Sequence, residues 1–293
     1  MVEFGEVLTA MVTPFKKDFS LDLAQAAELA NHLVDNGSDG IVVCGTTGEA
    51  PTLSGSEKLE LFKTVREAVP KEKKVIANTG NYCTEESIVL TKQAEKTGVD
   101  GCMLVVPYYS KPPQDGLERH FRAIAEATSL PVIVYNVPSR TAKNLEAETL
   151  IKLAKVENIV GVKEASCDLE QVGKIIKNVS EDFLVLSGED AVTFPIIALG
   201  GHGVISVASH VVGKELKEMI TSAKEQNIDR AREIHLRLLP LFKTLFLTTN
   251  PIMVKKAVEL MGIEVGPPRL PLVEATDQET TKLKSLLEEM NLI

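Results

Sequence analysis

Short apolar segments alternate with amphipathic segments along most of the chain. Eight apolar segments, rich in Val and Ile, occur at residues 7–12, 40–44, 74–77, 101–106, 132–135, 159–162, 183–186 and 203–206. Their hydrophobicity is nearly continuous, which is typical of strands covered on both faces, whereas half-exposed strands alternate polar and apolar positions. The pattern therefore predicts eight parallel strands.

Helices are predicted between these strands. Residues 22–36, 57–68, 85–97 and 117–127 repeat apolar side chains at spacings of three and four. Eight strand and helix units predict a (β/α)8 TIM barrel, whose usual size is about 250 residues. An open, doubly wound sheet is the alternative, but GTTGE after the second strand lacks the G-x-G-x-x-G spacing of a dinucleotide-binding turn.

Polar pairs at helix-capping spacing mark several predicted helix starts: Ser54 with Glu57, Asp168 with Gln171, and Thr276 with Glu279. After residue 226 the strand pattern ends, and helical patterns follow at 228–247, 251–261 and 277–290. We predict a barrel domain at 1–226 that carries the active site, and a C-terminal helical appendage at 227–293.

Composition narrows the possible functions. The chain of 293 residues has 44% hydrophobic residues, enough for one large core, and a formal net charge of -9. It has no large basic field for a nucleic acid or an anionic membrane. The acidic start and the lack of an apolar run near ~18 residues predict a cytoplasmic protein without a signal peptide or membrane span. The four Cys and five His residues are scattered, so neither a disulfide nor a metal site is expected.

Residues with reactive side chains follow the predicted strands. In a TIM barrel the C-terminal ends of the strands meet at one rim, which carries the active site. The candidates at this rim are Thr46, Thr47, Tyr82, Tyr108, Tyr109, Tyr135, Arg140 and Lys163. The rim is therefore predicted to gather hydroxyl groups and two cations.

Lys163, in the segment IVGVKEA, ends an apolar strand. Strand alternation gives it the same facing as Gly161 and Ile159. If that face is the barrel interior, burial lowers the lysine pKa and leaves a nucleophilic amine that can condense with a ketone. Alternatively, a lysine at a strand end reaches solvent or pairs with Glu164.

Neighbouring candidates favour the nucleophilic interpretation. Tyr135 ends the adjacent strand, and Thr46 and Tyr109 offer hydroxyls for a proton relay. Arg140 has planar donors suited to a carboxylate. The SGED and GVIS segments of the last two strands bring no Lys or Arg for a phosphate, so we expect small carboxylate substrates rather than sugar phosphates. A single Tyr is more often a packing or interface residue and a single Arg a surface residue, so the prediction depends on their joint occurrence.

Six motifs together resemble those of the dihydrodipicolinate synthase and N-acetylneuraminate lyase family of class I pyruvate aldolases, over essentially the whole chain. They are GTTGE at 45–49, PYYSKPPQDG at 107–116, YNVPSRT at 135–141, GVKEAS at 161–166, LSGED at 186–190 and GHGVIS at 201–206. The resemblance implies that Lys163 forms a Schiff base with pyruvate and that Tyr135 is the acid and base. It further implies that Thr46 and Tyr109 complete the proton relay.

The resemblance also implies how substrates are bound. Thr47 and the backbones of Gly188 and Ile205 would line the pyruvate pocket. Arg140 marks the dipicolinate branch of the family, in which it holds the carboxylate of L-aspartate 4-semialdehyde. The implied product is 4-hydroxy-tetrahydrodipicolinate, a precursor of diaminopimelate and lysine. No cofactor is implied, because the imine itself is the electron sink.

Two other functions remain as alternatives: a sibling aldolase acting on 2-keto-3-deoxy sugar acids, and a non-catalytic, metabolite-binding barrel. In relatives the residue corresponding to Tyr109 enters the active site of the neighbouring subunit. The resemblance therefore implies a homotetramer built as a dimer of dimers.

The resemblance is incomplete at residues that concern regulation. Relatives inhibited by lysine carry a serine and histidines after GTTGE and an asparagine after the third strand. At these places the chain has Ala50, Gly55, Lys58 and Tyr82. Only Glu86 and Tyr108 match, so we predict weak or absent inhibition by lysine.

Overall fold

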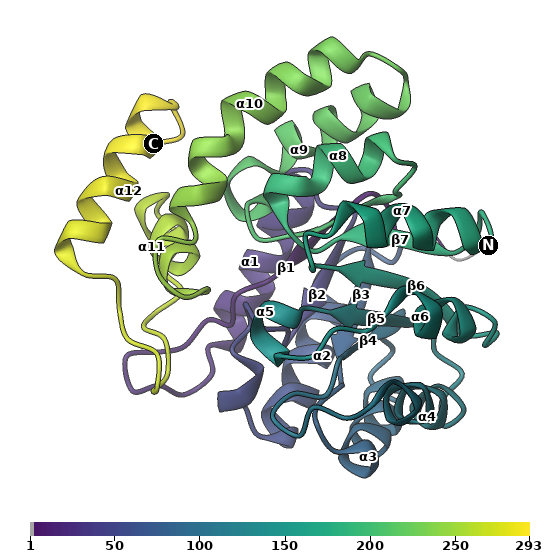
Figure 1. Ribbon diagram of the computed structural model, residues 1–293. Helices are drawn as coiled ribbons and strands as arrows, with labels where there is room; N and C mark the ends of the chain where they lie inside the picture. Colours follow the sequence, from purple (N-terminus) through teal and green to yellow (C-terminus); the bar gives the residue numbers. More distant parts are fainter. Residues whose placement is uncertain (1–2) are drawn as a thin grey trace.

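The computed structural model describes residues 3–293, in which eight parallel strands close into a barrel in chain order (Figure 1). The strands are β1 (Val7–Ala10), β2 (Gly40–Val43), β3 (Lys74–Asn78), β4 (Gly101–Val105), β5 (Val132–Asn136), β6 (Ile159–Glu164), β7 (Leu184–Ser187) and β8 (Gly203–Ser206). The first and last strands pair, with Val7 opposite Val204. The (β/α)8 barrel prediction is therefore confirmed, and the open sheet is wrong.

Each strand is followed by at least one helix. The helices are α1 (Leu23–Asp35), α2 (Gly55–Ala68), α3 (Thr84–Glu95), α4 (Gln114–Ala125), α5 (Pro138–Thr141), α6 (Ala147–Leu153), α7 (Leu169–Asn178), α8 (Thr193–Ala198) and α9 (Ser209–Lys224), with short 3-10 turns η1 (Ala50–Thr52) and η2 (Asp190–Val192). The predicted N-caps form: the side chains of Ser54, Asp168 and Thr276 accept the backbone N–H three residues on. These caps satisfy donors that would otherwise lack partners at the helix starts.

Apolar side chains fill the barrel interior. Leu8, Val42, Ile76, Met103 and Ile133 form part of one buried cluster there. Phe4, which precedes β1, belongs to the same cluster and packs close to Gly101, where a Cβ atom would come within 2.8 Å of its ring. The end of the barrel at which the strands begin is therefore packed, and the opposite end is left for the loops.

The C-terminal segment forms α10 (Ile228–Thr244), α11 (Ile252–Leu260) and α12 (Asp277–Glu289), drawn in green to yellow on one side of the barrel in Figure 1. Their apolar faces join the barrel helices in one core, to which α10 contributes Leu238, α11 contributes Met253 and α12 contributes Leu283. The predicted helical appendage is thus present, and the division into domains at 226 and 227 stays a prediction. None of the described helices is long and apolar enough to cross a membrane.

Candidate active site

A small cavity of about 140 Å³ opens at the rim where the strands end. It is lined by residues that follow several different strands, and by two from the C-terminal segment: Thr46, Thr47, Tyr135, Val137, Ser139, Arg140, Lys163, Ala165, Gly188, Glu189, Val207, Phe246 and Asn250. Pockets for drug-sized ligands measure about 300 to 1,000 Å³, so a cavity of this size suits a smaller ligand.

Lys163 lines this cavity from β6. It pairs in the sheet with Tyr135 on one side and Leu186 on the other, and its side chain points into the barrel interior with only 6% of its surface exposed. Burial lowers the pKa of the amine to about 8, while the charges of Asp190 and Glu189 oppose this shift. About one amine in ten is therefore neutral at pH 7.

Glu164, the next residue, faces away from the cavity. Its carboxylate accepts hydrogen bonds from the Asn136 side chain, the Ser166 N–H and the Gln171 side chain at 2.8 to 3.1 Å. The pairing of Lys163 with Glu164 considered from the sequence is therefore absent. The exposed alternative is excluded by the burial of Lys163.

Tyr135 packs directly against the lysine, with the Lys163 Nζ 4.3 Å from its ring centre. Burial raises the phenol pKa above its usual value, whereas the adjacent Thr46 hydroxyl and the Arg140 charge oppose the rise. The phenol therefore keeps its proton near neutral pH. Its ring also shields one side of the amine from water.

Two carboxyl groups approach the amine from the β7 side. Asp190 is fully buried and is held by the Ser206 hydroxyl and by the N–H groups of Val207 and Ala208 at 2.5 to 3.1 Å. Glu189 lines the cavity itself, and burial, with the neighbouring Asp190 charge, raises its pKa. Asp190 is thus fixed by the fold, while Glu189 faces the space that a ligand would occupy.

Arg140 sits between the small cavity and a larger one of about 570 Å³. The larger cavity shares Thr46, Tyr135 and Val137 with the small one. It extends to residues that were compared above with lysine-inhibited relatives: Ala50, Lys58, Tyr82, Glu86 and Tyr108. A guanidinium group in this position can contact a ligand carboxylate from either side.

Six of the eight predicted site residues come together around the small cavity: Thr46, Thr47, Tyr135, Arg140, Lys163 and Gly188. Two do not. Ile205 lies inside the barrel in β8 and is not among the lining residues, and Tyr109 projects away with 94% of its surface exposed. The predicted roles of Ile205 and Tyr109 therefore stay predictions.

Three polar residues of the cavity, Ser139, Glu189 and Asn250, were not predicted as site residues. Ser139 and Glu189 lie within the YNVPSRT and LSGED motifs but received no role. Asn250 lies in the connection between α10 and α11, and its side-chain Nδ2 donates to the Thr47 hydroxyl at 2.9 Å. No local motif indicates this contact, because 203 residues separate the two in sequence.

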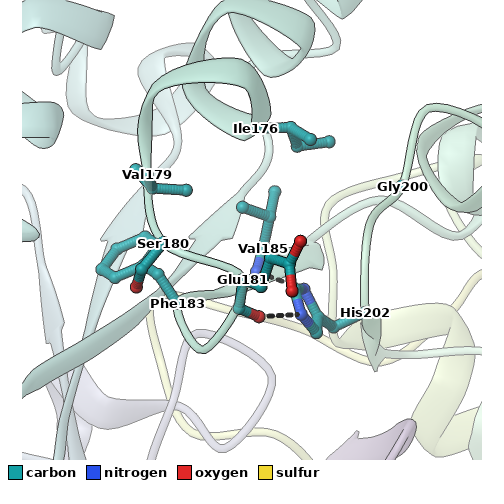
Figure 2. Close-up of a pocket in the computed structure, with 8 residues that line it drawn as sticks. All are labelled: Ile176, Val179, Ser180, Glu181, Phe183, Val185, Gly200 and His202. Atoms are coloured by element: carbon teal, nitrogen blue, oxygen red, sulfur yellow. Dashed lines mark hydrogen bonds between the residues drawn. The ribbon is translucent and has the colours of Figure 1, made fainter.

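Another cavity, of about 190 Å³, lies at the opposite end of β7, and neither a lysine nor a tyrosine is among its lining residues (Figure 2). Its polar centre is His202, whose Nδ1 accepts the Val185 N–H at 3.1 Å and whose Nε2 donates to the Glu181 carbonyl at 3.3 Å. Both ring nitrogens are thus used in holding the backbone. No group of three or more His, Cys, Asp or Glu residues suited to a metal ion occurs within residues 3–293.

The fold and the cavity define the class of protein: a (β/α)8 barrel with a buried lysine at the active-site rim. The model of the dihydrodipicolinate synthetase family matches residues 3–290. A 4-hydroxy-tetrahydrodipicolinate synthase of Desulforudis audaxviator is 55% identical over 292 residues, covering 100% of this chain and 99% of the relative. The chain belongs to the dihydrodipicolinate synthetase family.

Solved structures agree with this assignment. The dihydrodipicolinate synthase of Cyanidioschyzon merolae, solved with lysine bound, is 48% identical with a TM-score of 0.97, and 99% of each chain is covered. A chloride-inhibited dihydrodipicolinate synthase of Acinetobacter baumannii, complexed with pyruvate, is 36% identical with a TM-score of 0.96, covering 99% of this chain and 100% of the other. The fold and the family membership predicted from the sequence are both confirmed.

Proposed function

We propose that this chain condenses pyruvate with L-aspartate 4-semialdehyde to give 4-hydroxy-tetrahydrodipicolinate, through a Schiff base on Lys163. The observation that carries the proposal is the buried Lys163 amine, with a pKa of about 8, in the lining of a small cavity. At pH 7 about one amine in ten with this pKa is neutral, compared with about three in ten thousand for an unperturbed lysine. The full-length similarity to enzymes with this activity supports it.

In the first half of the reaction the neutral Lys163 Nζ attacks the ketone carbon of pyruvate, and loss of water leaves an imine. The phenolic oxygen of Tyr135 takes a proton from the pyruvate methyl group as its own proton passes to Thr46, and the two electrons of the C–H bond form the enamine. The Thr47 hydroxyl and the Gly188 backbone bind the pyruvate carboxylate. Ile205 is proposed to contribute its backbone to the same pocket.

In the second half the enamine carbon attacks the aldehyde carbon of the second substrate, the C=O π bond breaks, and the aldehyde oxygen takes back the proton that was removed from the methyl group. Arg140 holds the carboxylate of this substrate, which fixes the aldehyde beside the enamine. The amino group of the substrate then attacks the imine carbon, closes the ring and releases Lys163. No electron acceptor is consumed, because the imine nitrogen takes up and returns the electron pair.

We further propose that the active unit is a homotetramer, a dimer of dimers in the cytoplasm. Tyr109 supports this proposal, since an almost fully exposed tyrosine with left-handed backbone at φ 68 is poorly placed to act in its own cavity. In the proposed assembly it completes the proton relay of the neighbouring subunit. Replacement of Tyr109 by Phe should then lower kcat without affecting imine formation.

Borohydride reduction in the presence of pyruvate, followed by peptide mass analysis, tests the proposal. We expect one reduced pyruvyl group on Lys163 and none on the Lys163→Ala variant. Assays with aspartate semialdehyde and with 2-keto-3-deoxy sugar acids then separate the proposed reaction from that of a sibling aldolase. A non-catalytic barrel would acquire no adduct, and that result would overturn the proposal.

A further inference from the structure

The loop between β2 and α2 supplies Thr46 and Thr47 to the cavity and has an unusual backbone. Cys44 and Glu49, which lie in this loop on either side of the two threonines, are both left-handed, with φ values of 56 and 55. Residues other than glycine rarely adopt this conformation, and they keep it only where the surrounding structure holds them. The position of Thr46 and Thr47 therefore depends on what fixes Cys44 and Glu49.

Glu49 is fixed by the C-terminal segment. Its side chain is 0% exposed and pairs with Lys255 of α11, which is 4% exposed, at 2.9 Å. The other carboxylate oxygen accepts the backbone N–H of Arg269 at 2.8 Å. The Lys255 amine also donates to the carbonyls of Thr13 and Pro267 at 3.1 and 3.2 Å. Both oxygens of the carboxylate thus bind residues more than 200 positions away.

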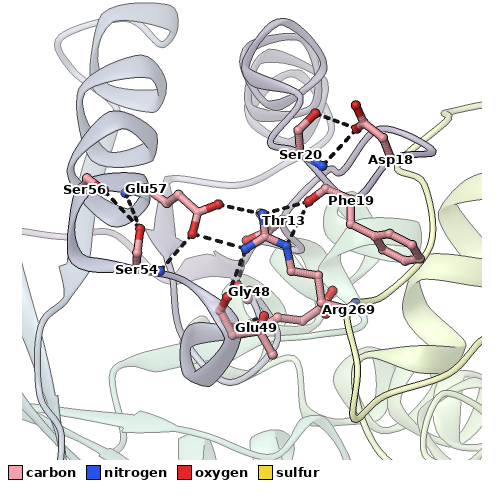
Figure 3. A network of polar contacts seen from close by, with 11 residues as sticks. Thr13, Asp18, Phe19, Ser20, Gly48, Glu49, Ser54, Ser56, Glu57 and Arg269 are labelled. Atoms are coloured by element: carbon pink, nitrogen blue, oxygen red, sulfur yellow. Dashed lines mark hydrogen bonds and ion pairs between the residues drawn. The ribbon is translucent and has the colours of Figure 1, made fainter.

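Arg269 extends this attachment to the rest of the loop (Figure 3). Its guanidinium group donates to both carboxylate oxygens of Glu57 at 2.6 and 3.1 Å, to the Thr52 carbonyl at 2.9 Å and to the Phe19 carbonyl at 2.7 and 2.9 Å. The same contact lowers the pKa of Glu57 to about 2. One side chain thereby joins the loop, the start of α2 and the connection after β1.

We propose that Glu49, Lys255 and Arg269 are positioning residues that set the places of Thr46 and Thr47 in the cavity. None of the three lines the cavity, so an effect on a bound ligand has to pass through the loop. The direct contact of Asn250 with Thr47 adds a further attachment from the same C-terminal segment. This inference rests on the proposed function, because it concerns the binding of pyruvate.

The Lys255→Met variant of the full chain tests the inference. It replaces the ammonium group by an uncharged side chain of similar length and leaves the Glu49 carboxylate without its main partner. We expect the KM for pyruvate to rise at least about fivefold, and by more than kcat falls. The KM for the aldehyde substrate should change less than about twofold, since Arg140 lies on another loop.

Two further variants separate positioning from stability. Glu49→Gln combined with Lys255→Met leaves no unpaired charge and keeps an oxygen for the Arg269 N–H, so the pyruvate KM should return to within about threefold of the original. Arg66→Met removes the partly buried contact with Asp100, which precedes β4 at the far end of the barrel. This control should lower the melting temperature without changing either KM.

If Lys255→Met does not fold, Arg269→Met takes its place, because Arg269 and Glu57 are 17% and 25% exposed and tolerate the change better. A folded variant with reduced melting temperature and unchanged pyruvate KM would show that Glu49, Lys255 and Arg269 have only a structural role. Borohydride trapping keeps the two proposals apart. If the unaltered enzyme forms no adduct, the proposed function fails. If it forms the adduct but the variant's KM for pyruvate rises no more than its KM for the aldehyde substrate, only the positioning role fails.

Discussion

Replacement of Lys163 by Met should stabilise the folded protein although it removes the reactive group. The side chain is 6% exposed, and burial lowers its pKa from 10.5 to about 8. The folded state therefore disfavours the ammonium form, which the unfolded chain accommodates freely. Methionine has similar length and no charge, so it can fill the same space beside Tyr135 without this penalty.

The size and the pH dependence of the gain follow from the two pKa values. At pH 7 the lysine is mostly protonated in both states, and the pKa difference between 10.5 and about 8 corresponds to about 3 kcal/mol against folding. Between pH 8 and 10.5 the folded state binds fewer protons than the unfolded state, so the penalty declines as the pH rises. At pH 9.5 about 1.4 kcal/mol of it should remain.

Urea denaturation at equal protomer concentration measures this gain as the difference in unfolding free energy between variant and parent. We expect it to be about twice as large at pH 7 as at pH 9.5. Lys63→Met is the matched control, since the Lys63 side chain is 64% exposed and its replacement should change stability by less than about 0.5 kcal/mol. A Lys163 variant no more stable than the parent at pH 7, or a gain independent of pH, would refute the reasoning.

Three other outcomes are expected. Tyr135→Phe should lower kcat by about 10² to 10⁴ and still give the borohydride adduct, because proton transfer is lost and the amine remains; loss of the adduct would contradict this. Arg140→Met should raise the KM for aspartate semialdehyde by at least about tenfold and that for pyruvate much less, as measured by initial rates. Free lysine at sub-millimolar concentration should leave the rate unchanged, because the cation of Lys58 and the Ala50 methyl group line the larger cavity; clear inhibition would overturn this prediction.

The fold could be predicted because buried parallel strands leave a strong signal. All eight apolar segments became strands, and the helices differ from their predicted ranges by a few residues at the ends. The sixth strand is instructive: it was predicted to end at Lys163 and continues by one residue to Glu164, which pairs with Ser187. Hydrophobicity could not predict this last position, since a buried ionisable residue resembles a strand end in sequence.

The site was predictable where reactive residues sit at strand ends in motifs, as with Thr46, Tyr135 and Lys163. It was not predictable where contacts join distant segments. Asn250 reaches Thr47 because the connection between α10 and α11 lies beside the loop after β2, and the local sequence around each residue gives no indication of the contact. Patterns along the sequence report burial and local geometry, whereas such a contact depends on how whole elements pack.

Burial of an ionisable side chain does not by itself distinguish Lys163 from Glu164 and Asp190. Glu164 is also buried, and burial raises its pKa. Its carboxylate, however, accepts several hydrogen bonds, and Asp190 is held in the same way. The shifted pKa of Lys163 arises from burial and nearby charges, with no hydrogen bond from the described residues among its causes. A buried group whose hydrogen-bond partners come from the surrounding structure contributes to the stability of the fold. An amine that borders a cavity and lacks such partners is held at a cost in stability, which is why its replacement should stabilise the chain and end the reaction together.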